Sequence, residues 1–173
     1  MYTVQSVLFL ARSQLSYHEG QADGHWNNVQ KYSKQLPGFS WSDGQPWCCT
    51  FAHWNLWQAG IEVPKGARSA SCATSVAAFK KAGRFTEYPV TGAVVFYGEG
   101  GGEHCGIVVG WDLMHVKAIE GNTNTNGSAE GDGVYVKHRE RRTEYVYGYG
   151  IPYYPHDLAE TPDPQWKDQP MGG

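Results

Sequence analysis

The sequence lacks both a polybasic run and a long apolar run, and these absences exclude several classes of protein. Its formal net charge is -3 with histidine neutral, so nothing predicts electrostatic capture of nucleic acid or of an anionic membrane. The apolar run at residues 7–11 is too short to span a bilayer and has no positively charged leader before it. We therefore expect no nucleic-acid partner, no membrane partner and no signal peptide.

Cysteine is scarce, and its spacing is not that of a disulfide framework or a common metal site. The four cysteines are Cys48, Cys49, Cys72 and Cys105. Adjacent cysteines rarely pair with each other, and no C-x-x-C or H-x-x-x-H spacing is present. The acidic residues near the N-terminal half do not form a calcium-loop pattern either. We therefore predict a reduced protein with no cofactor and no required metal, which disfavours a zinc-binding structural protein.

The hydrophobic pattern changes from helical to alternating about halfway along the chain, and there is no internal repeat. The predicted helices span residues 3–16, about 46–60 and 72–81, and the predicted strands span 92–97, 105–111, 115–120, 133–138 and 145–151. Helices first and strands later predict an α+β domain, with N-terminal helices packed on an antiparallel sheet. We assign residues 1–154 to this domain and 155–173, which are rich in Pro, Asp and Glu, to a linker or tail.

One cysteine lies where a helix is predicted to begin. Pro46 suits the first position of a helix, and Cys48 follows it within the first turn. Unpaired backbone N–H groups and the helix dipole stabilise a thiolate there and can also receive an oxyanion. Cys49 is rotated by about 100° along the helix, so both thiols cannot face one cleft. Cys48 is therefore the candidate nucleophile, and Cys49 and Cys72 are interpreted as packing residues.

A histidine at the mouth of a predicted strand is the candidate base. If this strand and the next form a hairpin turning at residues 111–113, His104 lies opposite Glu120. A register shifted by two residues places Asn122 there instead, and either side chain could orient the imidazole. Gly106 lies on the same face and leaves room. Cys48, His104 and an orienting Glu120 or Asn122 would together form the cysteine–histidine–acid arrangement of a nucleophilic hydrolase.

These residues together resemble the CHAP family of cysteine- and histidine-dependent amidohydrolases and peptidases, which are common in phage endolysins. The similar segments are Trp-Cys-Cys-Thr-Phe at 47–51, His-Cys-Gly-Ile-Val at 104–108 and Glu-Gly-Asn-Thr at 120–123. The resemblance spans roughly residues 2–153. It implies that Cys48 is the nucleophile and His104 the base, with Glu120 and Asn122 as the acid and amide. Cys49 and Thr50 depart from the small residues that family members often have there.

The resemblance also implies a papain-like fold and peptidoglycan as the substrate. Cys48 would attack an amide or peptide carbonyl, and His104 would protonate the leaving amine. With no signal of its own, such a protein would be made in a host cytoplasm and reach the cell wall after holin-type release. We expect a monomer, either alone or as the catalytic part of a longer lysin with a wall-binding domain. The predicted substrate-binding residues, chosen by position, are Trp41, Gln45, Trp47, Glu103 and Asn124.

Other functions compete with the endolysin hypothesis. A bacterial toxin or a phage tail-associated wall hydrolase could use the same site. A non-catalytic wall-binding module could use exposed tryptophans to stack on sugars. An NlpC-type peptidase uses a similar Cys–His pair, but it typically has an aspartate where Trp47 stands and a second histidine where Glu120 stands. The scissile bond and the host wall type are not specified by any motif.

Overall fold

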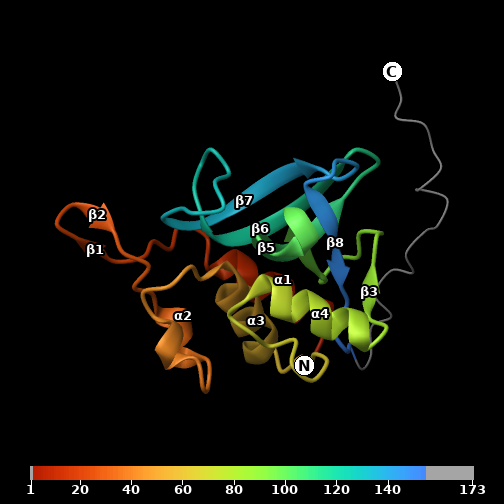
Figure 1. The fold of residues 1–173 in the computed structure, drawn as a ribbon, viewed down its shortest axis with the longest axis horizontal. Coiled ribbons are helices and arrows are strands. Elements are labelled where there is room, and N and C mark those ends of the chain that lie inside the picture. The colour runs from red at the N-terminus through yellow and green to blue at the C-terminus, as the bar shows by residue number, and fades with distance from the viewer. Residues whose placement is uncertain (1, 155–173) are drawn as a thin grey trace.

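The computed structural model describes residues 2–154 as an α+β fold, in which four helices gather on one side of a six-stranded antiparallel sheet (Figure 1). The predicted fold class is therefore confirmed. The linker or tail predicted at residues 155–173 lies outside the described residues. None of the described helices is long and apolar enough to cross a membrane.

Three of the four helices form where the apolar spacing predicted them. The four are α1 (Val4–Ser13), α2 (Lys31–Gln35), α3 (Cys48–Gln58) and α4 (Cys72–Lys81), with short 3-10 turns at Ser40–Ser42 and Glu99–Gly101. Thr3 caps α1 by accepting a hydrogen bond from the backbone N–H of Ser6. Helix α1 is shorter than the predicted 3–16. The five-residue helix α2 was not predicted, because so short an element carries too little periodicity.

Helix α3 lies at the centre of the molecule. Every residue from Cys48 to Leu56 is buried, including Thr50, His53 and Asn55. Such a helix is apolar on nearly all sides because neighbours cover each of its faces. It packs on β5 and β6 and also contacts α1 and α2. The start of α3 is therefore held firmly against the middle of the sheet.

The sheet has the strand order β3-β8-β4-β5-β6-β7. Its strands are β3 (Phe85–Thr86), β4 (Val94–Tyr97), β5 (His104–Trp111), β6 (His115–Thr123), β7 (Gly133–Glu140) and β8 (Val146–Gly150). A separate hairpin of β1 (Gln21–Ala22) and β2 (His25–Trp26) lies in a segment where no element was predicted. Strands of only two residues, such as β1, β2 and β3, leave no alternating pattern to detect.

The two faces of the sheet carry separate cores. Ile107 pairs with Ile119, and both pack in the core shared with α3. Val108 pairs with Ala118, and both belong to a second cluster on the opposite face. The period of two therefore assigns alternate residues of β5 and β6 to opposite faces.

The register of the β5–β6 hairpin differs from the first one predicted. The pairs Ile107–Ile119 and Val108–Ala118 correspond to the alternative register, shifted by two. The turn lies later than residues 111–113, because the backbone N–H of Asp112 bonds the carbonyl of His115. A β-bulge between Val108 and Gly110 then shifts the pairing by one more residue.

In this register Glu120 crosses over Gly106. A Cβ atom on Gly106 would lie 2.6 Å from Cγ of Glu120 and 3.0 Å from the carbonyl oxygen of Ile119. Only the absence of a side chain on Gly106 leaves room for the Glu120 side chain at this point. Gly110, on the same strand, has no such neighbour within 4 Å.

We expect Gly106→Ala to lower the free energy of unfolding by about 1–3 kcal/mol, because the added methyl group overpacks a closed site. Gly110→Ala is the matched control and should change it by less than about 0.5 kcal/mol. Urea denaturation followed by circular dichroism measures both. Equal stability of the two variants would contradict the close approach of Glu120 to β5.

Candidate active site

Cys48 is the first residue of α3, so it lies in the first helical turn as predicted, although the helix begins two residues after Pro46. No side chain caps this helix start, and the first helical backbone bond runs from the N–H of Phe51 to the carbonyl of Trp47. The N–H groups of Cys48, Cys49 and Thr50 therefore precede the intrahelical ladder and can serve an anion. Cys48 is 5% exposed, whereas Cys49 is fully buried. Of these two residues, only Cys48 retains any exposed surface.

The other cysteines strongly influence the Cys48 thiol. A contact with Cys105 lowers its pKa, but the hydrogen bond to Cys72 and burial outweigh this and raise the pKa above its ordinary value. The Sγ atoms of Cys48 and Cys72 are 3.7 Å apart. The lowered pKa expected from the helix start is therefore not the net result. A thiolate at Cys48 depends on transferring its proton to a nearby base.

Contacts with Cys105 and Cys72 lower the pKa of the neighbouring Cys49 to about 6. Ionisation alone would favour Cys49 as the nucleophile. Cys49 has no exposed surface, however, and a buried thiolate cannot attack a polymer. Accessibility therefore favours Cys48.

His104, at the start of β5, lies in a buried chain of alternating charges. Its Nε2 is 3.0 Å from Oε2 of Glu120, and both side chains are fully buried. Arg139, on β7, completes the chain: its Nε donates to Oε1 of Glu120 at 2.9 Å, and its Nη2 donates to Oε2 at 2.5 Å. This bidentate pair fixes the carboxylate that in turn fixes the imidazole.

The charges in this chain shift one another's pKa values. Burial by itself lowers the pKa of His104, but nearby Cys48 and the bonded Glu120 outweigh it and raise the pKa to about 9. Burial raises the pKa of Glu120, but Arg139 and His104 outweigh it and lower the pKa below its ordinary value. At neutral pH the site therefore favours an imidazolium beside the Glu120 carboxylate. Nδ1 of His104 has no hydrogen-bond partner among the described residues and remains able to exchange a proton.

Arg139 is the functional residue that the sequence reasoning missed. Its guanidinium lies 4.7 Å from the ring centre of Tyr97 and 5.3 Å from that of Tyr145. Tyr97 also stacks on the His104 ring, with centroids 5.9 Å apart. Arg139 shares a face with Glu120, because it lies four residues along β7 from Tyr135, which pairs with Glu120. Pairing the third and fourth predicted strands, and extending the fourth by one residue beyond 138, would have indicated this position.

Asn122 does not contact His104 through a hydrogen bond. It adopts a left-handed backbone conformation with φ of 56°, which asparagine tolerates better than most residues. Its side-chain nitrogen donates to the carbonyl of Ala129, and its buried Oδ1 has no partner among the described residues. Of the two predicted orienters, the structure places Glu120 against the imidazole.

The predicted substrate-binding residues are scattered. Trp47 is fully buried: its indole N–H donates to Glu19 and its ring stacks on Tyr32. Trp41 is 71% exposed, and Gln45 and Glu103 are also exposed. Asn124 accepts hydrogen bonds from the backbone N–H groups of Asn126 and Ser128. Only Asn124 lines one of the described pockets.

That pocket is an acidic groove of about 350 Å³. Its lining residues are Glu19, His25, Trp26, Asn28, Asn124, Glu130, Gly131 and Asp132. Glu19 links the groove to the active-site segment, because it accepts a hydrogen bond from Trp47. Of the described pockets, this groove is the one whose lining is hydrogen-bonded to Trp47, the residue before Cys48.

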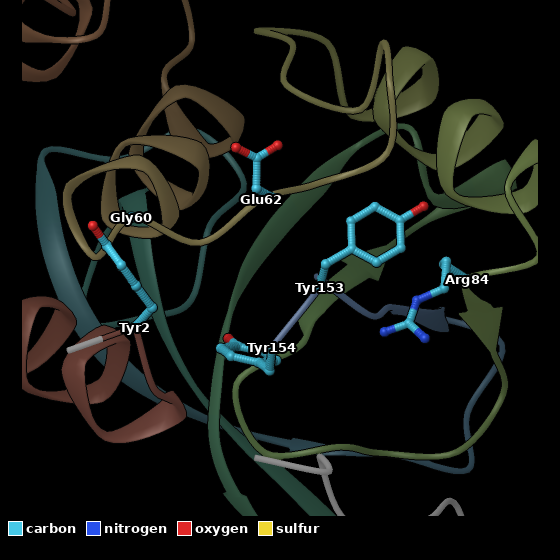
Figure 2. Close-up of a pocket in the computed structure, with 6 residues that line it drawn as sticks. All are labelled: Tyr2, Gly60, Glu62, Arg84, Tyr153 and Tyr154. Atoms are coloured by element: carbon cyan, nitrogen blue, oxygen red, sulfur yellow. The ribbon is translucent and has the colours of Figure 1, made fainter. Parts of the chain in front are cut away.

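A larger pocket, of about 580 Å³, lies elsewhere. Figure 2 shows the six residues that surround it: Tyr2, Gly60, Glu62, Arg84, Tyr153 and Tyr154. Arg84 donates to the backbone carbonyls of Ile151 and Pro152 and lies over the Tyr153 ring. The pocket contains none of the predicted site residues, so its size does not make it the active site.

Comparison with known proteins shows the fold. No family model and no curated protein matches the sequence. The structure is similar to RipB, a peptidoglycan hydrolase from Mycobacterium tuberculosis, with a TM-score of 0.51 and 18% identity over 86% of this chain and 63% of that one. A mutated form of RipA, a resuscitation promoting factor interacting protein, gives a TM-score of 0.49 and 18% identity over 86% and 60%. The chain thus spans less than two thirds of either protein. The predicted papain-like α+β fold is confirmed.

Proposed function

We propose that this chain is a cysteine peptidase or amidase that cleaves a peptide or amide bond of peptidoglycan, with Cys48 as nucleophile and His104 as base. The observation that carries the proposal is the buried His104–Glu120–Arg139 chain beside a cysteine at a helix start. If Cys48 were only a packing residue and His104 an ordinary strand-end histidine, there would be no reason to bury the Glu120 carboxylate against the imidazole ring. Peptidoglycan as substrate is supported by the fold shared with RipB and by the resemblance to CHAP enzymes.

The chemistry follows from the geometry. The Cys48 thiolate attacks the carbonyl carbon, and the N–H groups at the start of α3 stabilise the oxyanion. His104 gives its proton to the amine as the C–N bond breaks, leaving an acyl-enzyme. His104 then takes a proton from water, the hydroxide attacks the thioester, and Cys48 leaves as thiolate with the acid product. Glu120 and Arg139 hold the imidazole and are positioning residues.

The finer assignment is a CHAP-type phage endolysin. Trp47 before the cysteine and Glu120 against the histidine favour a CHAP-type site over the NlpC-type alternative, which shares the papain-like fold. Asn122 is assigned to the amide position of that site. A bacterial toxin or a phage tail-associated hydrolase would use the same residues. Action at the cell wall after release through the host membrane is part of this assignment.

Four of the five residues predicted to bind substrate have side chains that a substrate could reach. Trp41, Gln45 and Glu103 present exposed side chains, and Asn124 lines the acidic groove. A groove with three carboxylates suits an amino group of a stem peptide or cross-bridge. The buried Trp47 instead supports Cys48 from the core.

The central test is the release of soluble fragments from purified peptidoglycan, identified by mass spectrometry. Wild type and Cys49→Ala should release the same fragments, whereas Cys48→Ala should release none, because the nucleophile is lost. The fragment masses would name the bond. Fragments from Cys48→Ala would reject Cys48, and no fragments from wild type on walls of several chemotypes would reject the substrate class.

The pH profile tests the imidazolium. Because His104 must be protonated to expel the amine and its pKa is raised to about 9, kcat/KM should fall as pH rises through about 9. In Glu120→Gln the neutral amide stabilises the imidazolium less, so the fall should move to lower pH. Glu140→Gln, an exposed carboxyl on β7, is the control and should retain the wild-type profile. Superimposable profiles for Glu120→Gln and wild type would contradict the assigned role.

Arg139 is tested by separating kcat from KM. In Arg139→Gln the carboxylate loses its bidentate partner, so kcat should fall about tenfold or more, equivalent to about 1.4 kcal/mol, with little change in KM. The alkaline fall should also shift, which a merely structural role would not produce. His138→Ala, on the exposed face of the same strand, is the control. A change in KM alone would place Arg139 in substrate binding instead.

A further inference from the structure

Three cysteines from separate elements converge beside the active site. Cys48 begins α3, Cys72 begins α4 and Cys105 lies on β5. Their Sγ atoms all lie within 4.8 Å of one another, and all three side chains are buried. All four cysteines of the chain are free thiols. Packing of apolar residues alone does not require three thiols to point at one place, since alanine or valine would fill it equally well.

The geometry matches that of thiolates around one ion. Zinc–sulfur bonds are about 2.3 Å, so two sulfurs on one tetrahedral ion lie about 3.8 Å apart. The Cys48–Cys72 distance of 3.7 Å agrees with this spacing. The sequence argument against zinc was the lack of C-x-x-C or H-x-x-x-H spacing, in which two ligands lie close together in the sequence. It does not apply here, because the three ligands come from two helix starts and a strand.

Two of the three cysteines lie close to the protein surface. Cys48 and Cys72 are each 5% exposed, whereas Cys105 is fully buried beneath them. An ion would enter between the two helix starts and meet Cys105 at the bottom. A disulfide between Cys48 and Cys72 would use only two of the three thiols and leave the position of Cys105 unexplained.

We propose that Cys48, Cys72 and Cys105 form a site for a thiophilic divalent cation of the zinc class, and that the bound ion masks the nucleophile. Binding converts three thiols to thiolates and releases three protons, with water completing the coordination. The masking, which rests on the proposed function, follows because a sulfur bonded to the ion cannot attack a carbonyl. The ion and the peptidoglycan substrate would therefore be mutually exclusive.

The test is a titration of the reduced, metal-free protein with Cd²⁺, followed by the thiolate-to-cadmium absorption band, and with Zn²⁺ in competition with a chromophoric chelator. Wild type should bind one equivalent. Cys72→Ser and Cys105→Ala should each weaken binding about 100-fold or more, because even changes behind metal ligands cost about 10–100-fold. Cys49→Ala retains all three ligands and is the matched control, with unchanged stoichiometry.

Three outcomes would overturn the site: no uptake by reduced wild type, uptake that survives both ligand variants, or a Cys48–Cys72 disulfide in place of metal binding. Masking is measured separately. One equivalent of Zn²⁺ should stop fragment release by wild type, and a chelator should restore it. Cys72→Ser should keep most of its own metal-free rate under the same conditions. If metal-free wild type releases no fragments, the proposed function fails, while the titration still decides the metal site.

Discussion

The carboxylate of Glu120 is fully buried in the sheet, and its charge must be compensated there. Arg139 and His104 supply that compensation from the strands on either side. Removing one partner of such a buried pair leaves an uncompensated charge, which is far more costly than losing an exposed pair. The order β5-β6-β7 and the register that sets Gly106 against Glu120 are therefore tied to the same electrostatic requirement. The geometry of the site and the stability of the sheet are coupled.

The second constraint is the position of α3. A helix that is buried along most of its length cannot shift without disturbing several packed layers, so its first residue is placed as rigidly as the core itself. Trp47 strengthens this anchor through its hydrogen bond to Glu19 and its stacking on Tyr32. The proposed nucleophile and the proposed base thus come from different elements of one packed structure. Preorganisation of this kind lowers the cost of bringing reacting groups together.

The surroundings of Cys48 act in opposite directions on its reactivity. The contact with Cys105 lowers the pKa of the thiol, and His104 and the helix start also favour the thiolate, whereas Cys72 and burial raise the pKa. In the proposed mechanism, His104 is therefore needed to form the Cys48 thiolate as well as to protonate the leaving group. The same crowding of thiols that makes Cys48 a poor isolated acid also makes the cluster a good ligand set for a soft cation. In these two proposals, the same cluster of cysteines supplies the nucleophile and binds the cation that blocks it.

The sequence by itself determined the elements with a clear period and the position of Cys48 in the first turn of a helix, because these depend on local spacing. It also placed a strand-end histidine opposite either an acid or an amide. It left Glu120 and Asn122 as equal candidates, since a hairpin register depends on where the turn closes and on the bulge after Val108. Only the tertiary structure selected Glu120 and recruited Arg139 from the next strand. It also brought Cys72 and Cys105 to Cys48. These contacts join residues far apart in sequence, and packing of whole elements, which no local pattern encodes, decided them.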